Sequence, residues 1–315
     1  MMMYIITLTL RDIMFDYRQL QALATVIEEQ SFERAAKRLF LTQSAISQRI
    51  KQLEESAGQL LLVRSQPLRL TDAGQQLQRY YHQVTLLQDE LLTHLNNAQQ
   101  EGFNKLTIGL NADSLATWFM DAMQPLMEQS PILLDLRIDD QDQTHQLLRQ
   151  GDVQGCISAS SKPLQGSNAV LLGISRYLAL ASPRFMQHYF PDGVSSATLT
   201  QAPAVEYNEK DDLQNSYIQR FYPEVQDYQR HRVPSSEAFT ELIKRGFAWG
   251  MAPDLQMKSL LERGEVVELV PGKSIEVPLY WHSWNLATDT GHRLSEQLIR
   301  YCQQHLEQPT SRSSY

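Results

Sequence analysis

Several features are scarce or missing in this 315-residue sequence, and each absence excludes a class of protein. Cys156 and Cys302 are the only cysteines, too few for a disulfide framework or a zinc cluster, which is typical of a reducing compartment. No apolar run reaches the length of a transmembrane helix. The eight histidines are scattered outside any known nucleophile context, and there is no glycine-rich phosphate loop. We therefore expect a protein that is not an enzyme and that has no cofactor and no metal.

Charge is unevenly distributed along the chain. The formal net charge is −8, yet residues 1–100 hold ten basic and ten acidic residues. Within residues 31–70 there are seven basic residues against three acidic ones. A nucleic-acid site needs a local basic face and not a basic whole protein, so this stretch remains compatible with DNA binding.

The first fifteen residues form an N-terminal extension that is unlike a secretory signal. They contain a short apolar stretch, but no basic residue precedes it and no small-x-small cleavage site follows it. We expect residues 1–13 to be an upstream over-extension of the reading frame or a disordered tail.

A pair of short helices separated by a tight turn is predicted within residues 31–53. In the first helix, apolar residues recur at positions i, i+3, i+4 and i+7 from Phe32 to Leu39, so one face can be buried. Ser31 and Thr42 stand just before the two helices, where a side-chain oxygen can accept from the first free backbone N–H groups. An ordinary helical hairpin has the same pattern, so the pair alone does not establish a function.

The second helix, predicted at residues 43–55, has one apolar and one polar face. Ile46, Ile50 and Leu53 share the apolar side. The opposite face carries amides, hydroxyls and an amine without an acid, and a major groove accepts such a helix because amides can pair with adenine edges while basic residues meet phosphates. The residues expected to contact DNA, including two from the segment that follows, are Ser31, Arg34, Gln43, Ser44, Ser47, Gln48, Arg49, Lys51, Arg64 and Arg69.

Residues 60–71 are typical of a short two-stranded wing with a basic tip, and TDAG at 71–74 then opens another helix. The order, spacing and content of these pieces together resemble the LysR-type transcriptional regulators. The resemblance is carried by FERAAKRL at 32–39, TQSAISQRIKQLE at 42–54, LVR at 62–64 and LTDAG at 70–74. It implies a winged helix-turn-helix at residues 16–70 that binds double-stranded DNA, with RNA polymerase as a further partner.

One long helix is predicted from residue 71 to about residue 99. Its apolar residues repeat every seven positions, as at a coiled-coil seam. Packing on its own domain is the alternative, but we favour a dimer seam because a helix this long after a small domain has little else to bury against. The residues expected to form this seam are Leu77, Val84, Leu87 and Leu91.

From Lys105 onward, strands and helices alternate, which favours a mainly parallel sheet with covering helices. The resemblance implies two lobes and not one open sheet. The expected fold class is α+β multi-domain, with an N-terminal winged helix-turn-helix, a long linker helix and a C-terminal two-lobed α/β effector domain like the periplasmic binding proteins. The expected boundaries are a linker at 71–104, lobe I at 105–174 plus 276–306, lobe II at 175–275 and a polar tail at 307–315.

Hydroxyl-rich turns follow three predicted strands, at residues 111–114, 158–161 and 234–237. Each is explained singly by helix capping, but their common place beyond strand ends favours a cleft whose N–H groups hold a carboxylate. Acidic residues near other strand ends would suit a second positive charge, as in lysine or arginine. The residues expected to bind the effector are Asp113, Ser114, Thr117, Asp139, Ser158, Ser160, Glu206, Ser235 and Ser236.

The resemblance is sharpest to family members that respond to arginine and lysine. Beyond the helix-turn-helix it rests on NADSLATW at 111–118, YFPDGV at 189–194, SSEAF at 235–239 and YWH at 280–282. The chain departs from that group at Tyr207-Asn208, where Phe-Asp is expected, and this bears on amino-acid preference if the segment lines the cleft.

We therefore predict a cytoplasmic, nucleoid-associated bacterial regulator, a homodimer or homotetramer, that senses lysine or arginine and controls amino-acid transport or metabolism genes. The alternative is an α/β solute-binding protein or enzyme with an N-terminal oligomerisation module. An architectural role on DNA at replication origins is a third possibility.

Overall fold

The computed structural model describes residues 14–95, 103–139, 144–286 and 288–309. The chain divides into two compact units, residues 1–100 with 149–152, and residues 101–148 with 153–315. The extension expected at residues 1–13 lies outside the described residues.

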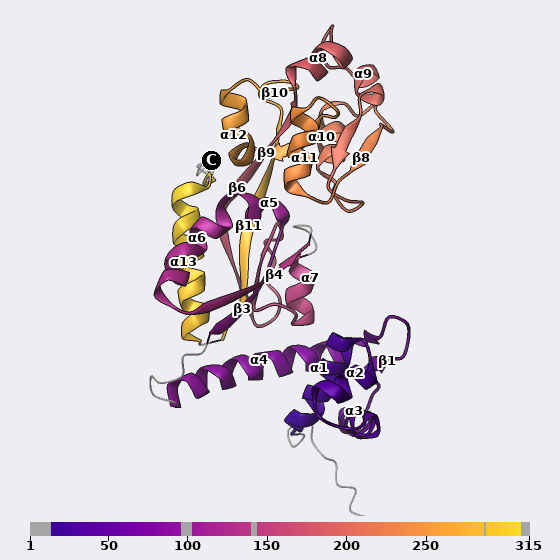
Figure 1. Cartoon of the computed structure of the whole chain (residues 1–315), viewed down its shortest axis with the longest axis vertical. Coiled ribbons are helices and arrows are strands. Elements are labelled where there is room, and N and C mark those ends of the chain that lie inside the picture. Colours follow the sequence, from indigo (N-terminus) through magenta and orange to yellow (C-terminus); the bar gives the residue numbers. More distant parts are fainter. Residues whose placement is uncertain (1–13, 96–102, 140–143, 287, 310–315) are drawn as a thin grey trace, which may run out of the picture. The chain divides into compact units, whose positions relative to one another are not determined.

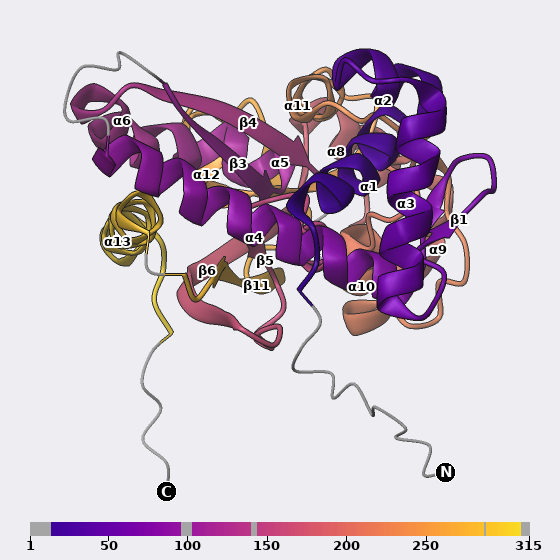
Figure 2. The same ribbon diagram turned by 90° about the horizontal axis from the view of Figure 1, so that it is seen from below.

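The first unit contains the predicted helix pair and wing. α2 and α3 pack with α1 around one apolar core whose fully buried residues include Leu23, Ile46 and Leu53. Figures 1 and 2 show these three helices grouped at one end of α4. The wing strands pair antiparallel, with Leu62 opposite Leu70. The elements are α1 (Tyr17–Glu29), α2 (Phe32–Arg38), α3 (Gln43–Ala57), β1 (Leu62–Val63), β2 (Arg69–Leu70) and α4 (Asp72–Leu95).

The long helix α4 has two environments along its length. Near its start, Leu77 packs against the core of the first unit. Towards its end, Leu87, Leu91 and Leu95 are 44%, 56% and 66% exposed. Two of the four predicted seam residues, Leu87 and Leu91, are therefore exposed, whereas Leu77 already belongs to the core; Val84 is half-buried. Residues 96–99 of the predicted helix lie outside the described residues.

The second unit is built on a mixed sheet with strand order β10-β6-β11-β5-β3-β4, and β9 pairs with β6. Only β3 pairs in parallel, with β4 and β5, whereas β6, β11, β9 and β10 pair antiparallel. The prediction of a mainly parallel sheet was therefore wrong. The strands are β3 (Asn104–Leu110), β4 (Ile132–Ile138), β5 (Gly155–Ser158), β6 (Ser167–Ala181), β9 (Gly250–Pro253), β10 (Val267–Glu268) and β11 (Ser274–Trp284).

The antiparallel pairs arise because two long strands cross from one lobe to the other. β6 is one continuous strand of 15 residues. It pairs with β11 along the whole of that strand, from Ser274 opposite Leu178 to Trp284 opposite Ser167. Continuous backbone pairing holds the polar residues Ser175 and Arg176 within the strand, although they interrupt its apolar pattern. The boundary expected between lobe I and lobe II, at residues 174 and 175, thus falls inside β6.

Helices cover the sheet in both lobes. In lobe I, α6 and α13 lie side by side (Figure 1). The helix that follows β3 begins as α5, passes through a π-helical segment, η2, and continues as α6. Among the described residues, no helix combines the length and apolarity needed to span a bilayer. The helices are α5 (Ala112–Ser114), η2 (Leu115–Phe119), α6 (Met120–Gln129), α7 (Thr144–Gln150), α8 (Pro183–Tyr189), α9 (Ser196–Gln201), α10 (Leu213–Phe221), α11 (Ser236–Lys244), α12 (Asp254–Glu262) and α13 (Asp289–His305).

Lobe II also has a small parallel sheet formed by β7 (Ala204–Glu206) and β8 (Arg230–Arg232). At the far end of the chain, the predicted polar tail begins with residues that belong to the fold. The carbonyl of Glu307 accepts from the N–H of Ile174 at 2.8 Å, and Gln308 donates to the Leu172 carbonyl at 3.0 Å. Glu307 and Gln308 are therefore fastened to the point where β6 leaves lobe I.

Candidate functional site

The polar face of α3 is open at the surface of the first unit. Ile46, Ile50 and Leu53 turn into the core. The opposite side chains leave a face of hydroxyls, amides and cations that a DNA groove can approach. Of these, Gln43, Ser44, Gln48 and Lys51 are exposed, and Ser47 and Arg49 are half-buried.

Hydrogen bonds at the helix ends fix the orientation of this face. The Thr42 hydroxyl accepts from the N–H of Ala45 at 3.2 Å, and Ser31 caps α2 in the same way. Glu54 on α3 accepts from the N–H groups of Leu61 and Leu62, at 2.9 and 3.3 Å. The wing is thereby tied to α3, while Ser31 is occupied as a helix cap.

The predicted phosphate contacts differ in how they are held. Arg34 donates to the Glu29 carbonyl at 3.0 Å and lies 3.7 Å from its carboxylate, while Lys51 is 3.7 Å from Glu55. Arg64 stacks over Phe32 at 5.5 Å. Within the described part of the chain, neither Arg49 nor Arg69 has an ion pair. Arg34 and Lys51 would therefore exchange an acid of the protein for a phosphate.

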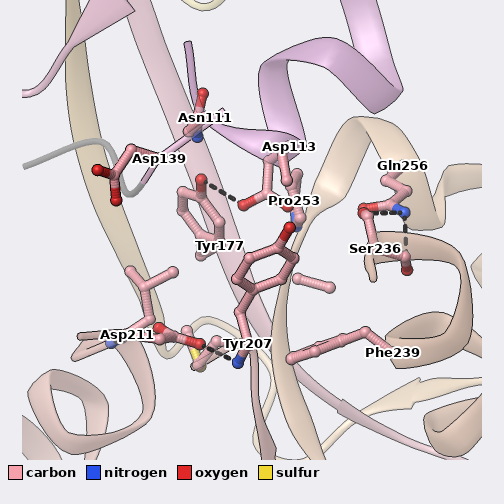
Figure 3. A pocket seen from close by; sticks show the side chains of 14 residues that line it. Asn111, Asp113, Asp139, Tyr177, Tyr207, Asp211, Ser236, Phe239, Pro253 and Gln256 are labelled. Carbon is pink, nitrogen blue, oxygen red and sulfur yellow. Dashed lines mark hydrogen bonds between the residues drawn. The ribbon is translucent and has the colours of Figure 1, made fainter. Parts of the chain in front are cut away.

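The second candidate site is a pocket of about 550 Å³ in the second unit, part of it open to solvent (Figure 3). It lies where β3, β4, β7 and β9 meet the first turns of α5, α10 and α11. The lining residues are Asn111, Ala112, Asp113, Asp139, Tyr177, Tyr207, Asp211, Leu213, Ser236, Phe239, Met251, Ala252, Pro253 and Gln256.

Three carboxylates line this pocket, from Asp113, Asp139 and Asp211, and no lysine, arginine or histidine is among the lining residues. Asp113 accepts a hydrogen bond from the Tyr177 hydroxyl at 2.9 Å (Figure 3). Burial, together with the Asp113 charge, raises the pKa of Tyr177 well above its ordinary value, so this phenol stays a donor. The pocket therefore gathers three acidic side chains around one space.

Asp211 is held from two sides by the backbone. Its carboxylate accepts from the N–H of Tyr207 at 2.8 Å and from that of Leu213 at 3.1 Å. Burial raises the pKa of Asp211, and these two hydrogen bonds oppose the shift. The pKa of Tyr207 is also raised, first by burial and then by the charge of Asp113.

The remaining polar groups lie at the edges of the pocket. Asp139 at the end of β4 is 3.2 Å from the ammonium nitrogen of Lys210. On the lobe II side, the Gln256 amide donates to the hydroxyls of Ser236 and Thr240, at 2.9 and 3.2 Å. Carboxylates from both lobes and a hydroxyl at the start of α11 thus surround one small space, an arrangement suited to binding a small, positively charged molecule.

Comparison with known proteins finds a matching protein family for each of the two units. The bacterial regulatory helix-turn-helix protein family of the lysR type matches residues 17–75, and the LysR substrate-binding domain matches residues 99–307. The chain belongs to the LysR family. It is a DNA-binding transcriptional regulator with an effector-binding domain, as the resemblance implied.

Individual LysR-family proteins are similar over nearly the whole chain. The HTH-type transcriptional regulator ArgP of Pseudomonas fluorescens (strain Pf0-1) is 45% identical over 288 residues, which cover 91% of this chain and 97% of that protein. The crystal structure of ArgP from Mycobacterium tuberculosis is 37% identical with a TM-score of 0.84, covering 94% of this chain and 100% of the other. Full-length LysG from Corynebacterium glutamicum with bound effector Arg is 35% identical with a TM-score of 0.76, covering 93% and 99%.

The pocket of this LysR-family chain gathers three of the nine predicted effector residues, Asp113, Asp139 and Ser236. Three others lie near it without lining it: Ser114 is buried within the start of the helix, Thr117 donates to the Asp113 carbonyl at 2.6 Å, and Ser235 caps α11 by accepting from the N–H of Ala238. The hydroxyls of Thr117 and Ser235 thus bond within the helix starts that carry the pocket residues.

The other three predicted effector residues lie elsewhere in the second unit. Ser158 is buried and accepts from the N–H of Ser160 at 3.2 Å, and the Ser160 carbonyl bonds to the His282 ring at 2.7 Å. Glu206 accepts from the Tyr228 hydroxyl at 2.8 Å, and its carboxylate lies 3.5 and 3.6 Å from two arginines of β8. Glu206 is thus neutralised inside lobe II.

Sequence reasoning missed most of the pocket's walls. Tyr177 lies inside an apolar run, and Phe239 and Gln256 lie on helices whose orientation the sequence does not give. Asp211 stands in a polar loop where many carboxylates are only solvated. One signal was present: the departure at Tyr207-Asn208 falls on a residue that does line the pocket.

Proposed function

We propose that this LysR-family regulator senses a basic amino acid, lysine or arginine, in the pocket around Asp113, Asp139 and Asp211. The observation that carries the proposal is the gathering of three carboxylates around one small space. A carboxylate removed from water is stabilised by a cation within about 4 Å, so an ammonium or guanidinium group is favoured there over a neutral side chain.

The pocket also suits the other end of an amino acid. α5 and α11 both begin at the pocket, and the first backbone N–H groups of a helix have no partner within it. Such groups bind carboxylates. The solved structure of LysG with bound effector Arg supports the same ligand class in a related protein.

The regulator would contact operator DNA through the exposed face of α3. Its protomers would pair through α4 as a homodimer or homotetramer, so that each dimer carries two DNA-binding domains, here called readers. Two readers that enter successive major grooves need half-sites about 34–36 Å apart. We assign it to the control of amino-acid transport or metabolism genes, without catalysis and in a cytoplasmic, nucleoid-associated setting. The relatives named as transcriptional regulators support this role.

Calorimetry on the full-length chain tests the ligand assignment. Arginine and lysine should bind, whereas citrulline, which replaces the guanidinium with a neutral ureido group, should bind far more weakly. At a hundred times its dissociation constant, a true ligand adds about 2.7 kcal/mol to the free energy of unfolding, so thermal shift gives an independent check. A gel shift with DNA from upstream of the gene, with and without arginine, completes the test. Equal affinity for arginine and citrulline would contradict the proposal.

A further inference from the structure

A lysine from lobe II already reaches one of the pocket's carboxylates. The Lys210 ammonium nitrogen lies 3.2 Å from Oδ1 of Asp139, which stands at the end of β4 in lobe I. Both side chains keep access to water, with 55% and 31% of their surface exposed. The pair therefore bridges the two lobes at the edge of the pocket and can open.

The loop that carries Lys210 is ordered by hydrogen bonds of its own. The side-chain oxygen of Asn208 accepts from the N–H of Lys210 at 2.7 Å, and its carbonyl accepts from that of Asp211 at 3.3 Å. The Asp211 carboxylate then accepts from Tyr207 and Leu213. Asn208 and Asp211 together hold Lys210 beside the pocket.

We propose that Lys210 is an internal competitor for the cationic end of the effector at Asp139. This inference rests on the proposed function. The ammonium group of Lys210 has the same chemistry as the side chain of lysine, and two cations on one carboxylate repel each other. A basic effector that uses Asp139 must therefore displace Lys210, whereas a neutral amino acid has no reason to do so.

The competition weakens the binding of basic ligands in particular. Because Lys210 is tethered, it competes at a high and constant effective concentration. Partly exposed ion pairs are weak, so its removal should strengthen arginine binding by about two- to five-fold. Lys210 would thus set the concentration range of basic amino acid to which the regulator responds.

The test compares Lys210→Met with Lys210→Arg by calorimetry on the full-length protein. Methionine keeps an unbranched stem of similar length without charge, and arginine keeps the cation. Lys210→Met should bind arginine about two- to five-fold more tightly while its affinity for citrulline is unchanged, and Lys210→Arg should behave like the wild type. Unchanged or weaker arginine binding by Lys210→Met would overturn the assignment, because Lys210 would then be neutral or would assist the ligand. An equal gain in citrulline affinity would also overturn the assignment. The gain would then come from loss of the link between the two lobes and not from removal of a competing cation.

Failure of the proposed function has a different signature. If neither the wild type nor Lys210→Met binds any basic amino acid, the ligand assignment falls and the competitor falls with it. If the wild type binds arginine and only the expected gain is missing, the competitor alone is rejected. A double-mutant cycle with Asp139→Asn in the ligand-free protein must also show stabilising coupling between the two side chains, and its absence would reject the pair itself.

Discussion

The two binding regions of this regulator carry opposite charge and differ in shape. The face of α3 is exposed and has amides, hydroxyls and cations between Gln43 and Lys51, with no acid. The pocket is concave, partly buried and lined by three carboxylates. DNA is an extended polyanion that touches many exposed groups, whereas a small effector depends on a few groups withdrawn from water. Affinity for DNA therefore depends on the number of contacts, whereas affinity for the effector depends on the strength of each contact.

This contrast determines how each site should fail. Exposed ion pairs contribute about 0–1 kcal/mol each and are screened by salt, and Arg34 already lies 3.7 Å from the Glu29 carboxylate. A partly buried carboxylate that loses its counter-ion, or a ligand that loses its carboxylate, costs several-fold more. Single substitutions should therefore affect effector binding more than DNA binding, unless they change the number of readers.

The largest expected effect comes from changing the number of DNA-binding domains in the assembly. Leu91 on α4 is 56% exposed, and we expect Leu91→Glu to place two repelling charges in the dimer seam. The protein should become monomeric, and operator affinity should fall by about a hundred-fold or more because one reader no longer tethers the other. Sedimentation and gel shift measure the two losses. Gln88→Glu adds the same charge at another exposed position of α4 and should leave the dimer intact; a dimeric Leu91→Glu protein would show that the seam lies elsewhere.

Asp113→Asn gives the second-largest effect. It keeps the shape of the side chain near Tyr177 but removes a charge that faces the ligand. Arginine affinity should fall by about thirty-fold or more, while the weak binding of citrulline changes little. Calorimetry measures both. Asp192→Asn, the same charge change at an exposed position, is the control. A variant that still binds arginine like the wild type would remove Asp113 from the site.

The same contrast explains how far the sequence could predict each region. The fold of α3 is encoded locally: Ile46, Ile50 and Leu53 are spaced for one face, and the structure buries all three. The capping roles of Ser31 and Thr42 follow from their position in the chain. A pattern of neighbours in sequence is sufficient wherever the partners are also neighbours in sequence.

In the pocket the partners are distant in sequence, so residue type alone is ambiguous. Glu206 ends β7 and Asp211 follows in the next loop, yet Glu206 turns inward to Tyr228 and Arg230, and Asp211 turns to the pocket. Tyr177 faces Asp113 only because β6 is one crossing strand, a consequence of its long pairing with β11. Neither fact can be obtained from the periodicity of a short segment.

A smaller effect is expected at the DNA surface. Gln48→Ala removes an exposed amide of α3 and should lower operator affinity by about 1–3 kcal/mol, while affinity for random DNA stays the same. The matched substitution is Arg49→Ala, which should weaken binding to operator and to random DNA alike. It should also reduce the slope of log affinity against log salt concentration by about one. Fluorescence anisotropy over a range of salt concentrations separates the two. Equal losses on operator and random DNA for Gln48→Ala would contradict its assignment as a base contact.

The smallest expected effect is a release of protons when the effector binds, which distinguishes the pocket from the DNA surface. Burial raises the pKa of Asp211 above its ordinary value of 3.8 in the ligand-free fold. A bound cation favours the ionised carboxylate and lowers that pKa again, so binding must release part of a proton at acidic pH near the raised value. Arginine affinity should accordingly rise with pH through this window, and above it the protonation of Asp211 should no longer make the affinity depend on pH. Calorimetry in two buffers of different ionisation enthalpy measures the release, and Asp211→Asn should abolish it. If the proton release persists in Asp211→Asn, the proton comes from another group. The assignment of the release to Asp211, and with it this difference between the pocket and the DNA surface, would then be wrong.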